Sequence, residues 1–153
     1  MLNVEAAVTF AATLPALLVV HNVADHWAQT SHQAATKGQR SHAGRVACAT
    51  HVATYTVFTA ATVALLWVAF GLPITPGGFA LGQLVSAITH YWADRRFTLA
   101  KLAALVGLGR FYRLGVPRDG RDDNPSLGTG SYALDQSWHW GWLAVAALLT
   151  AVS

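Results

Sequence analysis

Residues 4–25 read VEAAVTFAATLPALLVVHNVAD, an apolar run that ends in two ionisable side chains, His21 and Asp25. A helix of roughly 20 residues crosses the hydrocarbon core of a membrane, which is about 30 Å thick, so this run is long enough to span it. No basic residue precedes the run, and its apolar stretch continues into the ionisable pair. We therefore interpret it as a first membrane span rather than a signal peptide.

Three further apolar runs predict three more spans, at residues 46–70, 78–94 and 132–152. We expect an all-α membrane protein, in which four transmembrane helices form a single integral-membrane domain over residues 1–153. The apolar run at 97–109 is too short to span a membrane and contains Lys101, so it predicts an interfacial amphipathic helix. Residues 110–131 are rich in Gly, Pro and Asp towards their end, and we expect a cytoplasmic loop there.

The composition excludes several classes of protein. Only 11% of the 153 residues are charged, with 10 basic and 7 acidic side chains, whereas soluble domains carry about 25%. The single cysteine excludes a disulfide scaffold and a cysteine-rich zinc module. The basic residues accompany no nucleic-acid recognition motif, so we expect no nucleic acid partner. The expected surroundings are a lipid bilayer.

The positions of the basic residues predict the orientation. Positive residues are enriched in cytoplasmic loops, and all ten fall in the connections after the first and third spans. Both connections are then cytoplasmic, and the N-terminus, the Pro/Gly-rich turn at 71–78 and the C-terminus lie outside. The basic residues are Lys37, Arg40, Arg45, Arg95, Arg96, Lys101, Arg110, Arg113, Arg118 and Arg121.

Each span carries two polar or ionisable side chains four residues apart, a spacing that places both on one face of a helix. The first and third spans run towards the cytoplasm and carry their pairs near their ends, whereas the second and fourth run outwards and carry theirs near their starts. All four pairs are therefore expected at one depth, in the cytoplasmic half. The pairs are His21 and Asp25, His51 and Tyr55, His90 and Asp94, and Asp135 and His139.

The four histidines and three aspartates of these pairs predict a metal site. Ionisable residues are costly inside a membrane and are therefore functional candidates. Three carboxylates in a medium of low dielectric constant repel one another, and divalent cations remove that repulsion. Imidazole and carboxylate ligands suit one or two divalent transition metal ions, such as zinc, manganese or iron. The candidate ligands are His21, Asp25, His51, His90, Asp94, Asp135 and His139.

Other residues have supporting roles in this hypothesis. Arg95 and Arg96 follow the third pair and are expected to meet an anionic head group. The exposed ends of the spans carry His26, His32 and His42, which we expect to be solvated. The candidates for hydrogen bonding to the metal ligands are Gln29, Tyr55 and Gln136.

A repeated pattern relates the two halves of the chain. His21-x-x-Ala-Asp25 recurs as His90-x-x-Ala-Asp94, and each copy ends a span and enters a basic connection. The repeat predicts two related helical hairpins that share one central site.

These motifs, together with the late Asp135-Gln136-x-x-His139, resemble domain of unknown function 3307, a bacterial and phage integral-membrane family. The stretch Arg110-Phe-Tyr-Arg-Leu-Gly is similar to its actinobacterial branch. The resemblance covers nearly the whole chain and implies a multi-span fold in a bacterial cytoplasmic membrane. It supports the choice of site residues and implies no reaction.

Three functions remain open at this point. The first is a metal-dependent hydrolase that acts on a lipid or another membrane-held small molecule, because a bound metal activates water. The second is metal or proton transport or sensing, since His/Asp chains also serve as proton relays. The third is a non-catalytic membrane module that binds a partner through its basic connections, with the polar cluster holding the helices together. Homo-oligomerisation is also a reasonable expectation for so small a bundle.

Overall fold

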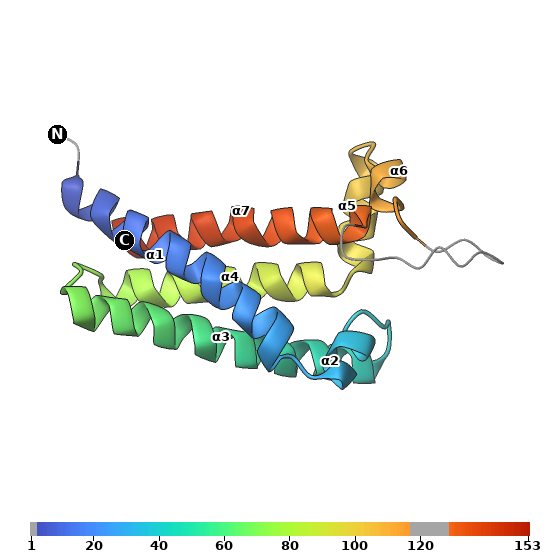
Figure 1. Cartoon of the computed structure of the whole chain (residues 1–153), viewed down its shortest axis with the longest axis horizontal. Coiled ribbons are helices and arrows are strands. Elements are labelled where there is room, and N and C mark those ends of the chain that lie inside the picture. The colour runs from blue at the N-terminus through green and yellow to red at the C-terminus, as the bar shows by residue number, and fades with distance from the viewer. Residues whose placement is uncertain (1–2, 117–128) are drawn as a thin grey trace.

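The computed structural model describes residues 3–116 and 129–153, and all regular structure in them is helical. This confirms the all-helical prediction for the described residues. Four long helices lie side by side and alternate in direction (Figure 1). They are α1 (Val4–Val23), α3 (His42–Phe70), α4 (Pro76–Asp94) and α7 (Gly130–Val152). The short elements gather at one end of the bundle, and they are η1 (Ala24–Ala28), α2 (Ser31–Thr36), α5 (Phe97–Leu105) and α6 (Gly109–Tyr112).

Capping residues explain where α2 begins and where α3 begins and ends. Thr30 and Gln33 form a capping box that starts α2 inside the first basic connection, where no helix was expected. The hydroxyl of Ser41 caps α3, which therefore begins at His42 rather than at the expected residue 46. α3 ends at Gly71, whose φ of 58° is the left-handed conformation that glycine adopts without strain.

The segment after α4 differs from the predicted interfacial helix. The helix expected at 97–109 is divided into α5 and α6, and Gly107, with a φ of 81°, lies in the break between them. α5 crosses the end of the bundle instead of continuing the direction of α4 (Figure 1). The predicted loop at 110–131 is also shorter, because α6 extends to Tyr112 and α7 starts at Gly130. Its central part, 117–128, lies outside the described residues.

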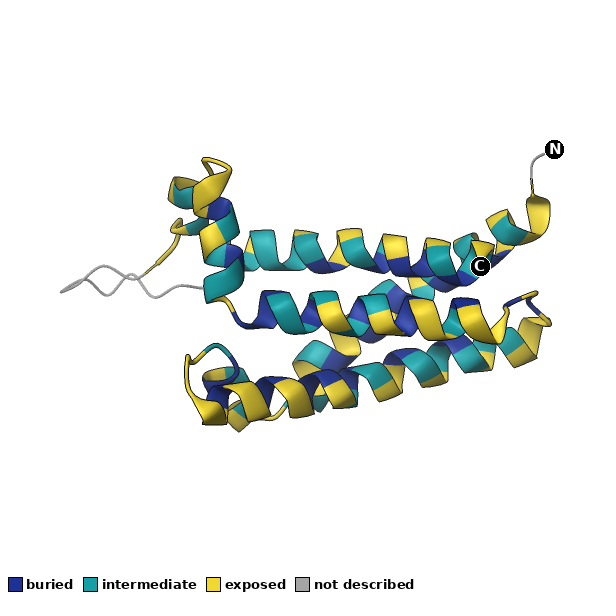
Figure 2. Cartoon of the chain, turned by 180° about the vertical axis from the view of Figure 1, so that it is seen from behind, coloured by how far each residue is buried: buried dark blue, intermediate teal, exposed yellow. Residues whose placement is uncertain are grey.

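The long helices bury polar side chains and expose apolar ones. An apolar core that includes Leu17, Val63 and Leu143 packs in the half of the bundle that contains the Pro/Gly-rich turn. Large apolar side chains are exposed on all four long helices. Figure 2 shows in yellow the exposed positions along the outward faces of these helices. Buried polar side chains outside the His/Asp pairs include Thr9, Thr13, Thr59, Gln83, Ser86 and Thr150.

Within residues 3–116 and 129–153, two stretches are long and apolar enough to cross a membrane. They are Val4–Ala28, which joins α1 and η1, and His42–Phe70, which is α3, each with a mean hydropathy of 1.7. This is weak evidence of membrane association, because length and composition alone also admit the core helix of a soluble protein. The prediction of four spans stays a prediction.

Candidate metal centre

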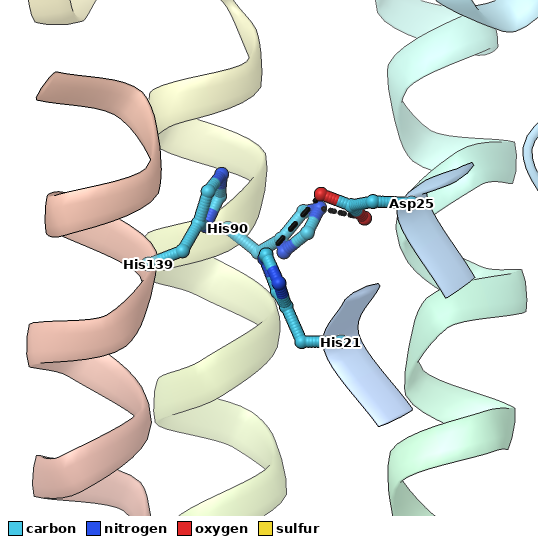
Figure 3. Close-up of side chains that lie close together, drawn as sticks. All are labelled: His21, Asp25, His90 and His139. Atoms are coloured by element: carbon cyan, nitrogen blue, oxygen red, sulfur yellow. Dashed lines mark ion pairs between the residues drawn. The ribbon is translucent and has the colours of Figure 1, made fainter. Parts of the chain in front are cut away.

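The His/Asp pairs converge where the four long helices come together near the end that carries the short elements. Figure 3 shows His21, Asp25, His90 and His139 pointing towards one another from α1, η1, α4 and α7. The nitrogen and oxygen atoms that these four residues could offer to a metal lie within 4.8 Å of one another. Three helices and the π-helical turn thus each supply one side chain to this group.

Two further groups of possible ligands overlap with the first. His51, His90 and Asp94 form one, and Asp94, Asp135 and His139 form the other, with the same 4.8 Å limit between ligand atoms. Within the described residues, the three groups together contain all seven residues that the sequence indicated as ligands. The structure brings them together, and their role as ligands stays a prediction.

The centre of this cluster is formed by two imidazoles and two carboxylates. His51 Nε2 lies 3.3 Å from Asp25 Oδ1 and 3.2 Å from Asp94 Oδ2. His90 Nε2 lies 3.4 Å and 3.2 Å from the same two oxygens, and 3.1 Å from His51 Nε2. Ligand atoms around a tetrahedral zinc ion, at bonds of about 2.0–2.1 Å, are about 3.3–3.4 Å apart. The observed spacings are therefore close to those of atoms that share a metal ion.

Many of these atoms are buried without a hydrogen-bond partner. Within the described residues, none is found for either nitrogen of His21, for Asp25 Oδ1, Asp94 Oδ2 or His139 Nε2. Some of them lie close to another ligand-type atom, as in the 3.3 Å contact between His21 Nε2 and Asp25 Oδ2, but they lack the alignment of a hydrogen bond. Buried polar atoms without partners are costly. A cation among them would relieve that cost, so this donor set fits a divalent transition metal.

A π-helical turn places Asp25 in the cluster. α1 changes at Ala24 into η1, and the N–H of Gln29 bonds to the carbonyl of Ala24, five residues earlier. Such turns are often found at functional sites. The wider turn ends the first long helix and leads into α2. The residue after α2, Lys37, contacts Asp94 of the cluster.

Lys37 is a member of the site that the sequence interpretation did not select. Its ammonium lies 2.7 Å from Asp94 Oδ1, and the side chain is almost fully buried. Asp94 therefore contacts Lys37 through one oxygen and the histidines through the other. Lys37 was noted only as part of the basic connection that sets the orientation. The neighbouring Gly38 lies against Arg96, because a Cβ there would be 2.8 Å from Cδ of Arg96.

The two arginines after Asp94 have different surroundings. Arg95 is only 5% exposed, and its guanidinium donates a hydrogen bond to the Gln39 carbonyl. These contacts hold the first connection against α4. The expectation that Arg95 meets a head group is therefore wrong, because its side chain is buried. Arg96 is exposed, donates to the Ala34 carbonyl at 3.1 Å, and has a φ of 52°, a strained conformation for a residue with a side chain.

The three residues expected beside the ligands all lie next to the cluster. The amide nitrogen of Gln29 is 3.0 Å from His51 Nε2. The Tyr55 ring stacks on His90 with centroids 4.0 Å apart, and its hydroxyl shares a 2.7 Å hydrogen bond with Ser86. Gln136 Nε2 lies 3.4 Å from Asp135 Oδ2. The histidines expected to be solvated, His26, His32 and His42, are exposed.

A cavity of about 400 Å³ lies beside the cluster, lined by residues of η1, α5, α6 and α7. Its lining includes Asp25, Asp94 and Asp135, and it also includes the cationic side chains Lys37 and Arg96. Tyr112 lines it as well, and partial burial together with the nearby Asp135 raises the pKa of its phenol, which stays a neutral hydrogen-bond donor. Acidic and basic groups thus face the same space.

The family comparison covers most of the chain. Residues 13–153 match the family described as "Protein of unknown function (DUF3307)". No curated protein and no solved structure matches the chain. The match includes every residue of the His/Asp cluster and the cavity beside it. The chain belongs to the DUF3307 family.

Proposed function

We propose that this protein spans a bacterial cytoplasmic membrane four times and uses its His/Asp cluster to bind a divalent transition metal. We further propose that it hydrolyses a lipid or another membrane-held molecule on the cytoplasmic side. The observation that carries the proposal is the convergence of seven buried or half-buried ligand-type side chains from the four long helices and η1.

The distribution of polar and apolar side chains supports four spans. α4 and α7 contain 19 and 23 residues, which is about 28 Å and 35 Å of helix. Both expose large apolar side chains, such as Leu84, Ile88 and Leu148, while α4 buries Gln83 and Ser86. The inward polar residues lower the hydropathy of these helices without contacting lipid. A polar interior beneath an apolar exterior is suited to a membrane.

The positions of the basic connections support the orientation. Lys37 and Arg40 are at the end of the bundle that also carries α5 and α6 with Lys101, Arg110 and Arg113. This end is proposed to face the cytoplasm. Exposed apolar side chains accompany the basic ones there, as an interfacial segment requires. They include Leu105, Val106, Leu108, Phe111 and Leu114.

Lys37 changes the charge balance of the site. Three ionised aspartates carry three negative charges, and the ammonium of Lys37 beside Asp94 offsets one of them. One divalent ion then neutralises the remaining two. A carboxylate that binds a metal through one oxygen commonly accepts a hydrogen bond on the other oxygen. Lys37 contacts Asp94 in this way, through Oδ1. The charge balance therefore favours a single ion over two.

A divalent metal held there would supply Lewis-acid chemistry and activate water for hydrolysis. The chain itself provides the ligands, the cavity and the positive side chains that hold a substrate. Asp135 has the most exposed side chain of the three aspartates, at 27%, and it faces the cavity. It is the carboxylate placed to accept a proton from water in that space.

Metal analysis of the purified protein tests this proposal. The wild-type chain, prepared in detergent without chelator, is expected to hold about one equivalent of a transition metal. Asp94→Asn and His139→Ala should lose it, whereas the exposed His32→Ala is the matched control and should keep it. Less than about a tenth of an equivalent in the wild type would contradict the proposal.

A second candidate, proton passage, is favoured by a track of buried polar groups leading away from the cluster. Tyr55 and Ser86 are hydrogen-bonded, and one turn further Thr59 donates to Gln83 Oε1 at 2.8 Å. Thr13 is buried in the same half of the bundle. Such a track resembles the relays of proton-conducting proteins.

Reconstitution into liposomes separates the two candidates. Proton passage predicts acidification of the liposome lumen under an imposed potential, which Tyr55→Phe and Thr59→Val should abolish. The exposed Val57→Ala is the control. A metal-loaded protein that conducts no protons would leave hydrolysis as the function that the site supports.

A further inference from the structure

A second cavity lies on the other side of Leu99 from the metal cluster. Its volume is about 260 Å³, and it runs between α5 and α7. Leu99 lines both cavities, and α7 contributes neighbouring residues to each, with Tyr132 and Asp135 in the first and Leu134 and Trp138 in the second. The two spaces are therefore adjacent and differ in character.

The second cavity is an apolar groove. Apart from Ser137, its lining is hydrocarbon and one indole ring, from Leu99, Leu102, Ala103, Val106, Leu108, Leu134 and Trp138. Trp138 forms one wall and is held in place by stacking on Trp92, with ring centroids 4.4 Å apart, and by donating to the Thr89 carbonyl at 3.2 Å. Such a surface suits a hydrocarbon chain.

The first cavity offers cations and hydrogen-bonding groups to a phosphate beside its three aspartates, whose negative charge the proposed metal and Lys37 would offset. Lys37 and Arg96 bring two cations to its wall, and Tyr112, Ser131 and Gln136 add neutral hydrogen-bonding groups. Gly38 permits this arrangement, because any larger residue would displace the Arg96 side chain. A guanidinium and an ammonium group close to a metal site are a common combination for binding phosphate.

From these two adjacent spaces, we propose that the ligand is a phosphate-bearing lipid. Its phosphate would lie in the polar cavity near Lys37 and Arg96, and its hydrocarbon chain would occupy the groove beyond Leu99. This inference rests on the proposed membrane function and specifies its substrate class. A water-soluble phosphate ester would use only the first cavity, and an uncharged lipid would use only the second.

Three probes in a neutral detergent, read by native mass spectrometry, test each half of the ligand. Dioctanoyl phosphatidic acid has both phosphate and chains, glycerol 3-phosphate has only the phosphate, and dioctanoylglycerol has only the chains. Phosphatidic acid is expected to bind at least about tenfold more tightly than either of the others. Equal binding of glycerol 3-phosphate would overturn the lipid assignment, and equal binding of dioctanoylglycerol would overturn the phosphate assignment.

Matched variants locate the binding. Arg96→Gln should weaken phosphatidic acid binding about tenfold, and the exposed Arg110→Gln should not change it. Leu102→Trp, at a position that lines only the second cavity, should fill the groove and weaken binding of phosphatidic acid but not of glycerol 3-phosphate. Leu105→Trp, at an exposed position of α5 outside both cavities, is its control. Equal losses in the variants and their controls would overturn the assignment to these cavities.

Metal content measured on the same samples keeps the two proposals separate. Leu102→Trp and Arg96→Gln leave all seven candidate ligands in place and should retain the metal. A metal-loaded wild type that binds none of the probes overturns the lipid inference and leaves the metal site intact. Selective phosphatidic acid binding by a protein without metal overturns the metal proposal and leaves the lipid inference standing.

Discussion

Lys37 Nζ lies 2.7 Å from Asp94 Oδ1, and both side chains are buried although they are 57 positions apart in the chain. The contact joins the connection after η1 to the end of α4. It also links the only lysine among the candidate site residues to a carboxylate that faces two histidines. The first basic connection therefore contributes a side chain to the cluster in addition to the role in orientation that we propose for it.

Removing Lys37 should destabilise the protein through Asp94. Lys37→Met leaves a buried carboxylate without its cation, and the loss of one member of a buried ion pair typically costs about 3–5 kcal/mol. The double variant Lys37→Met/Asp94→Asn should be more stable than Lys37→Met alone. Thermal unfolding in detergent with chelator measures both, and the exposed Lys101→Met is the control. A double variant no more stable than the single one would show that the pair is not coupled.

Metal affinity should depend more on His90 than on Asp135. His90 belongs to two of the three candidate ligand groups and lies within 3.4 Å of two aspartate oxygens, whereas Asp135 belongs to one group and is at the cavity. His90→Ala should reduce bound metal below about a tenth of an equivalent, and Asp135→Asn should retain a larger share. Elemental analysis after gel filtration provides the measurement. If Asp135→Asn instead lost more metal than His90→Ala, the metal would have to lie on the cavity side of the cluster.

Gly82 should be required for the close approach of α4 and α7. A Cβ at this position would lie 2.9 Å from the Ala146 carbonyl oxygen and 2.2 Å from Thr150 Oγ1. Gly82→Ala is expected to destabilise the bundle by about 1–3 kcal/mol, because the backbone of α7 must shift. Gly141 has no neighbour within 4 Å of such a Cβ, so Gly141→Ala should be neutral or slightly stabilising. Equal effects in unfolding titrations would contradict this packing.

Cysteine labelling should place the two ends of the bundle on opposite sides of the membrane. In a Cys48→Ala background, Pro73→Cys lies in the turn between α3 and α4, and Ala35→Cys lies in α2. A maleimide that cannot cross membranes should label residue 73 in intact cells and residue 35 only after lysis. Labelling of both positions in intact cells, or the reverse pattern, would contradict the proposed orientation.

The long helices and the ligand-type residues were predictable because they depend on local pattern. Apolar runs located α1, α3, α4 and α7 to within four residues at each end, and the spacing of four in pairs such as His21 and Asp25 placed both side chains on one helix face. The misplaced start of α3 and the divided 97–109 helix have local causes too, in the Ser41 cap and the turn at Gly107. A single capping residue or glycine is harder to recognise in a sequence than a long apolar run.

Contacts between distant segments were not predictable in the same way. Nothing local to Lys37 distinguishes it from a solvated basic residue, and Arg95, expected at a head group, is instead buried against Gln39. The pairing of a polar cavity with an apolar groove across Leu99 depends on where α5 crosses the bundle. The order of residues along the chain is thus sufficient for the helices, the family and the list of candidate ligands. The partner of each buried charge and the shape of the space beside it depend on how the helices pack, because those contacts join residues that no helical periodicity relates.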